Sequence, residues 1–256
     1  MLAVVLLMSL FPSQDLVSQF LSPRSDWSFF VDQTRFARFR TARGEKEDGL
    51  RQLLAERGLP AQPERVFLRV FKRERVLEVW VGHKDTDTFA LLKTYPVCAV
   101  SGVLGPKRRQ GDRQIPEGFY TIDRFNPASN YYLSLGLDYP NRSDRILGDK
   151  RDPGDDIFIH GNCVTIGCVP ITDPMIKELY LLCVVARCNG QKDIPVHIFP
   201  ARLTDANLAA LLEDHPQHET FWRNLQPVYV WFERHKSLPA IRVDDAGGYE
   251  IQAPAP

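Results

Sequence analysis

Short apolar runs dominate the middle of the chain, and polar or turn-forming residues separate them. Val66–Phe71 and Val76–Val81, with the charged segment KRER between them, predict a β-hairpin of β-branched and aromatic residues. Further strand candidates follow, bounded by Pro, Gly and Asp: FALLKTYPV, GFYTIDRF, YYLSLGL and DIFIHG. Because no regular helical pattern intervenes, these strands predict an antiparallel or mixed β core and not a doubly wound α/β fold.

Helical patterns precede this β-rich region. Aromatic residues recur within residues 26–40 and leucines within 49–57, so we expect a short helix over each segment. The stretch between them, 41–48, is charged and contains glycine, which predicts a linker.

Helical patterns also follow the β-rich region. Thr172 or Asp173 is expected to cap a helix that runs to about Arg187, and Thr204 to open another. An aromatic-rich helix is predicted over 219–234, and a short strand or loose tail over 244–256. The fold class predicted from the chain is therefore mainly β, or α+β, with helices at both ends.

The composition excludes several classes of protein. The 256 residues are 44% hydrophobic and 25% charged, which is ordinary for a folded globular protein. Lys plus Arg and Asp plus Glu both number 32, so the basic excess that a nucleic-acid partner calls for is lacking. Five cysteines are too few for a disulfide-stapled miniprotein.

The first eleven residues, MLAVVLLMSLF, form the longest apolar run of the chain. They fall short of the roughly 20 residues that a transmembrane helix needs, so no transmembrane segment is predicted. Their length suits the hydrophobic core of a signal segment or its remnant, although no basic residue precedes them and no small-x-small cleavage site follows. A buried N-terminal segment is the alternative.

Candidate chemistry is concentrated in the segment DDIFIHGNCVTIGCVPITDP. An apolar strand ends at His160-Gly161, and Gly167-Cys168 follows shortly before a predicted helix. A cysteine of ordinary pKa is only a few per cent thiolate at neutral pH, so a nucleophilic thiol needs a nearby base, which His160 can provide. Gly167 leaves room for a carbonyl group and for backbone N–H groups that stabilise an oxyanion.

The spacing alone leaves other interpretations open. His160 and Cys168 can be core residues, or His160, Cys163 and Cys168 can bind zinc with a fourth ligand from Cys183, Cys188 or His197. Paired C-x-x-C knuckles, typical of structural zinc sites, are missing from the sequence.

The remaining cysteines have less specific signals. Cys163 can form a disulfide in an oxidising compartment, but the sequence does not give its partner. Cys183 and Cys188 are five residues apart on a predicted helix, and Cys98 lies in a strand-like stretch. We expect all three to pack in the core.

HGNCVTIGC resembles the signature of the L,D-transpeptidase (YkuD) catalytic-domain family, in which a His-Gly pair precedes Ser/Thr-x-Gly-Cys. The matching residues are His160-Gly161 and Thr165-Ile166-Gly167-Cys168. LGPKRRQGDRQIPEGFYTI and LSLGLDYPNRSDR resemble further parts of the family, and the likeness extends over about 66–202. The short His-to-Cys interval, the extra Cys163 and VHIFPARLT look most like the YafK-like branch, one member of which is a peptidoglycan meso-diaminopimelate protein amidase.

The resemblance implies a β-sandwich with a small helical element and a thioester formed between the cysteine and a peptidoglycan stem peptide. Cys168 would be the nucleophile and His160 the general base. Gly167 and Cys168 would supply oxyanion N–H groups, with Thr165 and Gly161 shaping the loop. Water as acceptor gives hydrolysis, a second stem peptide gives a crosslink, and a lysine of a wall-attached lipoprotein gives anchoring.

Two departures from the family favour the amidase-like branch. Many transpeptidases have Arg two residues after the cysteine, where this chain has Pro170, and many have a longer insertion between His and Cys. We therefore expect an exported, periplasmic or otherwise envelope-associated cysteine enzyme that needs no metal or cofactor, with a non-catalytic regulator of wall enzymes and a zinc-stabilised module as the rival hypotheses.

The expected organisation has four parts: a signal segment or remnant at 1–22, a helical extension at 23–63, the L,D-transpeptidase-like domain at 64–202, and a helical extension with a tail at 203–256. Candidate contacts to stem-peptide carboxylates are a basic cluster and one amide, Lys107, Arg108, Arg109, Arg113 and Asn162. A solvated loop is the alternative interpretation of that cluster.

Overall fold

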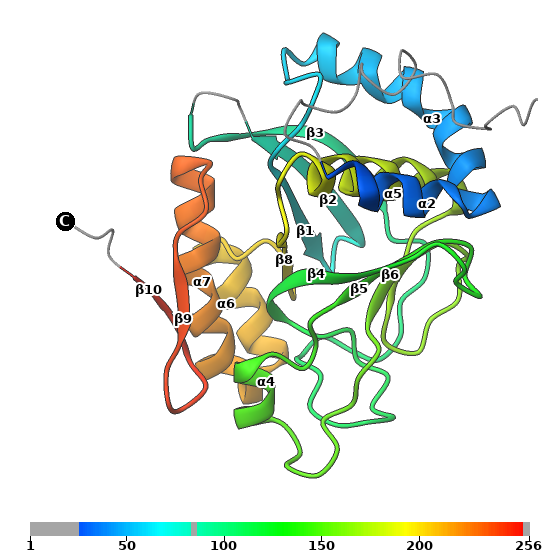
Figure 1. The fold of residues 1–256 in the computed structure, drawn as a ribbon. Coiled ribbons are helices and arrows are strands. Elements are labelled where there is room, and N and C mark those ends of the chain that lie inside the picture. The colour runs from blue at the N-terminus through cyan, green and yellow to red at the C-terminus, as the bar shows by residue number, and fades with distance from the viewer. Residues whose placement is uncertain (1–25, 83–85, 253–256) are drawn as a thin grey trace, which may run out of the picture.

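The computed structural model describes residues 26–82 and 86–252, and its centre is one eight-stranded mixed sheet (Figure 1). The strand order is β3-β2-β1-β8-β4-β5-β6-β7. Only β1–β8 and β6–β7 run parallel; the other neighbours are antiparallel. The strands are β1 Val66–Phe71, β2 Val76–Gly82, β3 Phe89–Pro96, β4 Gly118–Asn126, β5 Ser134–Leu137, β6 Phe158–His160, β7 Val169–Pro170 and β8 Ile194–Phe199.

Helices from the two ends of the chain cover different parts of this sheet (Figure 1). The N-terminal helices α2 and α3 pack with α5, whereas α6 and α7 lie on the other side with the hairpin β9–β10. Their bounds are α2 Trp27–Thr34, α3 Ala37–Glu56, α4 Arg142–Leu147, α5 Asp173–Cys188, α6 Asp205–Asp214, a 3-10 turn Pro216–His218, α7 Glu219–His235, β9 Ile241–Val243 and β10 Tyr249–Ile251.

Strand β1 shows why the central strands are apolar at nearly every position. Val66, Leu68 and Val70 join the core under the N-terminal helices, while Phe67 and Phe71 pack toward the C-terminal helices. Successive side chains of a strand point to opposite faces, so a strand covered on both faces loses the usual polar alternation.

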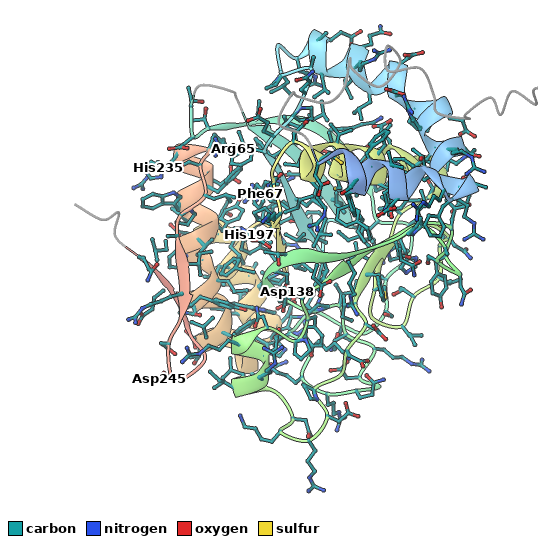
Figure 2. The ribbon with its side chains drawn as sticks, in the orientation of Figure 1. Arg65, Phe67, Asp138, His197, His235 and Asp245 are labelled. Atoms are coloured by element: carbon teal, nitrogen blue, oxygen red, sulfur yellow. A yellow bond between two sulfur atoms is a disulfide. The ribbon has the colours of Figure 1, made fainter. Side chains whose placement is uncertain are left out.

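His197 is buried on the face of the sheet that packs toward the C-terminal helices (Figure 2). It lies on β8 opposite Arg69 of β1, with its ring 4.7 Å from that of Phe67 and 4.6 Å from that of Phe119. Burial lowers the pKa of His197 well below its ordinary range, and Nδ1 has no hydrogen-bond partner. This histidine is a neutral core residue.

The predicted linker at 41–48 is wrong, because these residues lie inside the 20-residue helix α3. Phe39, Ala42, Leu50 and Leu54 are buried along it, so the apolar face continues through the charged stretch. Its charges pair within the helix, as Arg43 Nε and Glu47 Oε2 do at 2.8 Å, and also with α5, where Lys177 Nζ lies 2.7 Å from Glu45 Oε2.

The predicted fold class, a β core with helical extensions at both ends, is confirmed. The core is a single sheet that curls, so the layers implied by a sandwich are parts of one continuous sheet. The hairpin β1–β2 and the helices after Thr172 and Thr204 form where the sequence predicts them. Within the residues described, no helix combines the length and the apolar character needed to cross a bilayer, and the proposed signal segment at 1–22 lies outside them.

Candidate active site

The short parallel pair β6–β7 brings the segments that carry His160 and Cys168 next to each other. Ile159 pairs with Val169 and His160 with Pro170, so the same register continued by one residue sets Cys168 beside Phe158. Cys168 immediately precedes β7, so its backbone lies diagonal to His160 on the neighbouring strand.

The Cys168 thiol is half-buried at the start of β7 and lies 3.6 Å from the carbonyl oxygen of Asp156, to which it donates. Burial raises the pKa of this thiol, and the N–H of Phe158 and the positive charge of Lys107 oppose the rise only in part. The thiol is therefore protonated at neutral pH, and nucleophilic attack requires a base.

The imidazole of His160 has the properties that such a base needs. Its side chain is 1% exposed, and burial lowers its pKa, so the imidazole is neutral at pH 7. Nδ1 lies 2.5 Å from the carbonyl oxygen of Gly161; since a carbonyl only accepts, the proton is on Nδ1 and Nε2 carries a lone pair. Nε2 has no hydrogen-bond partner in the described chain, and the ring stacks on Tyr131 at 4.6 Å. The Cys168 thiol donates to Asp156 and not to His160, and catalytic hydrogen bonds are often long or poorly aligned in a free site.

The loop between the two residues is held by its own polar groups. Thr165 Oγ1 donates to the carbonyl oxygen of Cys168 at 2.8 Å and accepts from the N–H of Gly167 at 3.1 Å. Thr165 thus shapes the loop. The Gly167 N–H is already used inside the loop, so the oxyanion role predicted for it requires this bond to break.

Both glycines of the motif meet close neighbours. Gly167 has φ +145°, and a Cβ there would lie 3.1 Å from the carbonyl oxygen of Gln114. At Gly161 a Cβ would lie 2.6 Å from Asp173 Oδ1. The absence of a side chain lets the loop pack against these two segments.

A disulfide ties the same loop to the segment after β3. Cys98 and Cys163 are bonded, with Cα atoms 5.5 Å apart and a separation of 65 positions in sequence. The prediction that Cys98 is a core thiol is wrong, and Cys163 cannot serve as a zinc ligand while it is bonded to Cys98. Cys183 and Cys188 are buried in α5 as expected, which leaves Cys168 as the accessible thiol of the described chain.

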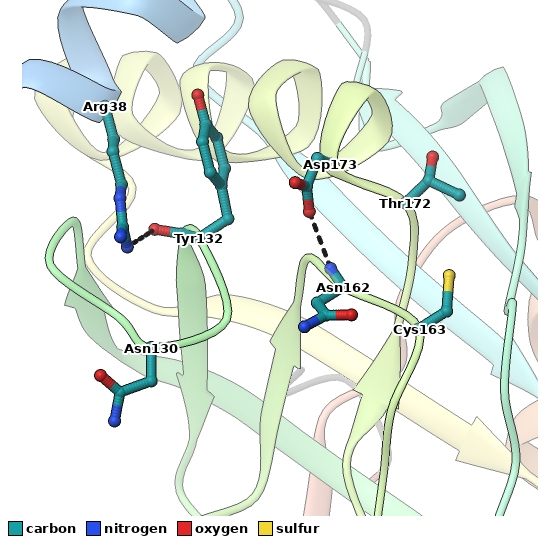
Figure 3. Close-up of a pocket in the computed structure, with 7 residues that line it drawn as sticks. All are labelled: Arg38, Asn130, Tyr132, Asn162, Cys163, Thr172 and Asp173. Carbon is teal, nitrogen blue, oxygen red and sulfur yellow. Dashed lines mark hydrogen bonds between the residues drawn. The ribbon is translucent and has the colours of Figure 1, made fainter.

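A cavity of about 430 Å³ lies beyond the carboxyl ends of β6 and β7 (Figure 3). Of its lining, the sequence indicated only Asn162 and Cys163 as candidate functional residues, and Asn162 uses its backbone N–H to donate to Asp173 Oδ1 at 2.8 Å. Its lining residues are Arg38, Asn130, Tyr132, Asn162, Cys163, Thr172 and Asp173. Arg38 comes from α3, 122 positions before His160, and no local sequence signal connects the two.

The predicted basic residues differ in whether their side chains have partners within the fold. Lys107 is 3% exposed and its Nζ lies 2.7 Å from Asp112 Oδ1, so it acts on Cys168 as a buried charge and is not open to substrate. Arg109 and Arg113 are exposed, and no hydrogen bond or ion pair joins their side chains to another described residue. They remain candidates for contact with carboxylates.

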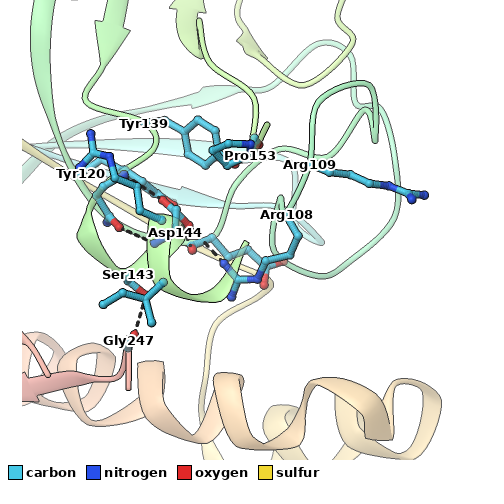
Figure 4. A network of polar contacts seen from close by, with 12 residues as sticks. Arg108, Arg109, Tyr120, Tyr139, Ser143, Asp144, Pro153 and Gly247 are labelled. Carbon is cyan, nitrogen blue, oxygen red and sulfur yellow. Dashed lines mark hydrogen bonds and ion pairs between the residues drawn. The ribbon is translucent and has the colours of Figure 1, made fainter. Parts of the chain in front are cut away.

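Arg108 fixes this loop to the rest of the fold (Figure 4). Its Nη1 lies 3.2 Å from Oδ1 of the buried Asp144, whose Oδ2 accepts from Tyr120 Oη at 3.0 Å. Burial raises the pKa of Asp144 to about 6, although the Arg108 charge opposes the rise. Arg108 is therefore a structural residue, and Asp144 and Asp112 are anchoring partners that the sequence did not indicate.

The comparisons with known proteins agree with the motif and the β core. Residues 65–198, more than half of the chain, match the family model of the L,D-transpeptidase catalytic domain, YkuD. The protein named "Putative L,D-transpeptidase YafK" from Escherichia coli strain K12 is 38% identical over 191 residues, 74% of this chain and 74% of its own length, and the same values hold for its counterpart in Escherichia coli O157:H7. The chain belongs to the L,D-transpeptidase catalytic-domain family, whose members are cysteine-dependent enzymes that act on the peptidoglycan of the cell envelope.

Solved structures also resemble this fold at low identity. The helical cell shape determining protein Pgp2 from Campylobacter jejuni is 17% identical, with 78% of this chain and 81% of that chain covered and a TM-score of 0.44. Bd1075 from Bdellovibrio bacteriovorus is 21% identical, with 64% and 58% covered and a TM-score of 0.39.

Proposed function

We propose that this protein cleaves amide bonds of diaminopimelate in peptidoglycan stem peptides through a thioester on Cys168, and so releases a wall-attached protein or peptide. The observation that carries the proposal is the β6–β7 register, which sets the half-buried Cys168 thiol next to the strand that ends in His160, whose Nε2 has no hydrogen-bond partner in the described chain. Within this proposal, residues 64–202 are the catalytic domain and the flanking segments are helical extensions.

The proposed chemistry needs only side chains and backbone. His160 Nε2 takes the Sγ proton while Sγ bonds to the carbonyl carbon, and the carbonyl oxygen becomes an oxyanion. Collapse of this intermediate breaks the C–N bond, and Nε2 returns the proton to the leaving amine, which gives a thioester. Water then attacks the thioester carbon, Nε2 takes one water proton, the C–S bond breaks, and the thiolate recovers the proton.

Transpeptidation is the alternative, and it differs only in the acceptor. An amine of a second stem peptide would give a crosslink, and a lysine of a lipoprotein would give anchoring. The match to a transpeptidase family favours it. The sequence departures at Pro170 and in the short His-to-Cys interval favour water as the acceptor.

We further propose an exported location in the cell envelope. The Cys98–Cys163 disulfide supports it, because disulfides persist in oxidising compartments and are rare in a reducing cytosol. Peptidoglycan as the family's substrate supports it independently.

The test compares the intact protein with Cys168→Ala and His160→Gln on isolated peptidoglycan that carries covalently attached protein, with products analysed by mass spectrometry. Released protein or shortened stem peptides with the intact protein alone are the expected result. New diaminopimelate–diaminopimelate crosslinks would indicate that the activity is transpeptidation and not hydrolysis. No product with any acceptor, together with full function of Cys168→Ala in cells, would overturn the enzyme proposal in favour of a regulator.

A further inference from the structure

A second cavity, of about 340 Å³, lies between the sheet and the chain that follows α7. Residues of β4 and β8 form one wall, and the segment 238–243 together with Tyr249 of β10 forms the other. None of the residues of the candidate active site lines it. A cavity of this size is typical of a small-molecule site, and the proposed reaction at Cys168 leaves it unused.

Most of the wall of this cavity is apolar. Leu238, Ile241 and Val243 contribute aliphatic side chains that are only partly buried. Phe119 and Tyr249 contribute aromatic rings whose centroids are 4.6 Å apart. Apolar side chains that remain partly exposed around a cavity favour a ligand with an apolar body, because such a ligand removes their surface from water.

The polar groups of the lining are neutral with one exception. Burial lowers the pKa of His197 well below its ordinary range, so its imidazole adds no positive charge. Burial also raises the pKa of Tyr120 and of Tyr249, so both phenols remain protonated. Among the described residues that line the cavity, Asp138 is the one that carries a charge at neutral pH.

Asp138 directly follows β5, is half-buried, and has hydrogen bonds but no counter-charge (Figure 2). Its Oδ1 accepts from the N–H of Thr121 at 2.8 Å, and no cationic side chain of the described residues forms an ion pair with it. Burial raises the pKa of Asp138 and the negative charge of Asp123 adds to the rise, while hydrogen bonds with Thr121 oppose it. A carboxylate that is partly removed from water without a cation favours a positively charged ligand.

We propose that this cavity binds a small organic cation, in which an ammonium group is carried on an apolar body. The ammonium pairs with Asp138, and the body packs against the aliphatic and aromatic wall. The rings of Phe119 and Tyr249 add to the preference for a cation, because aromatic faces attract positive charge. An alcohol of the same shape lacks the charge, and a carboxylate of the same shape is repelled by Asp138. The proposal does not depend on the proposed function.

Calorimetry on the intact protein tests this with three probes of one shape, n-hexylammonium, n-hexanol and hexanoate. We expect a Kd of about 1 mM for n-hexylammonium, as suits a ligand of so few atoms, and binding of the other two that is weaker by about tenfold or more. Val243→Phe, which places a larger side chain in the cavity, should weaken the binding of n-hexylammonium without a change of charge.

Asp138→Asn should lower the affinity for n-hexylammonium by about tenfold, to that of n-hexanol. The amide oxygen of this variant can still accept from the N–H of Thr121, so we expect the fold to be retained, and a thermal melt checks it. Asp123→Asn is the matched control, because Asp123 is a neighbouring carboxylate that does not line the cavity. It should change the affinity by less than about twofold.

Three results would overturn the assignment: no binding of n-hexylammonium up to about 10 mM, equal binding of all three probes, or unchanged binding in Asp138→Asn. Equal losses in Asp138→Asn and Asp123→Asn would overturn it too, since they would indicate a general effect of surface charge. No measurement here uses turnover. Failure of the proposed function therefore leaves this test intact, and an active enzyme that binds no probe would lose only the cavity assignment.

Discussion

Two buried histidines of this chain differ in where they lie and not in how deeply they are buried. His160 is 1% exposed and His197 is 4% exposed, burial lowers the pKa of both, and each has one ring nitrogen without a hydrogen-bond partner. His197 is inside the sheet between aromatic rings, whereas His160 is at a strand end beside the only accessible thiol of the described residues. A perturbed pKa therefore does not identify the functional histidine; its neighbours do.

The largest expected difference is in activity. His160→Gln should lower kcat/KM by about 10²–10⁴-fold, because the general base is lost, while His197→Phe should stay within about threefold of the unchanged protein. Steady-state hydrolysis of a stem-peptide amide measures both. A large loss of kcat/KM in His197→Phe, with an unaltered circular dichroism spectrum, would contradict the assignment of His197 as a core residue without a role in activity.

Loss of the disulfide should affect the His160 region much more than the His197 region. Cys98→Ser with Cys163→Ser is expected to lower the free energy of unfolding by about 2–4 kcal/mol, because the bond closes a long loop, and to loosen the loop before Cys168. Denaturant unfolding and activity with and without reductant check this. Reductant should have no effect on the double variant. If reductant affects the double variant as much as the unchanged protein, it acts at a site other than this disulfide.

Stability should fall as the pH is lowered from 7 to 5. Burial lowers the pKa values of His160, His197 and His218 below the ordinary value of about 6.5, so the unfolded chain binds more protons at these groups and is favoured by acid. Asp144 opposes part of this effect, because its raised pKa of about 6 makes the folded chain take up that proton first. Thermal melts at several pH values measure the slope. His197→Phe should reduce it by removing one of the three histidines, and an unchanged slope would show that His197 does not contribute.

The smallest expected effect is on the stability of His197→Phe at pH 7. A buried nitrogen without a partner costs about 1–3 kcal/mol, and phenylalanine removes it among aromatic neighbours, so we expect a gain of about 1 kcal/mol in the free energy of unfolding. Urea denaturation measures it. A loss above about 1 kcal/mol would indicate that the larger ring does not fit.

The sequence by itself determined the features that depend on short-range chemistry. The β1–β2 hairpin follows from two apolar runs and a charged turn. Helices α5 and α6 begin after Thr172 and Thr204 as predicted, although only the Thr204 side chain accepts a capping hydrogen bond. The candidate pair His160 and Cys168 was also predictable, because its residues lie close in sequence and match a family motif.

The tertiary structure decided the pairings between distant segments. The continuity of α3 depends on an apolar face buried against α5, which overrides the charged composition of 41–48. The Cys98–Cys163 bond, the Arg108–Asp144 pair and the presence of Arg38 and Asp173 in the lining of one cavity depend on which segments the sheet and helices bring together. Residue types fix what each group can bond, but only the packed fold fixes which partner is within reach.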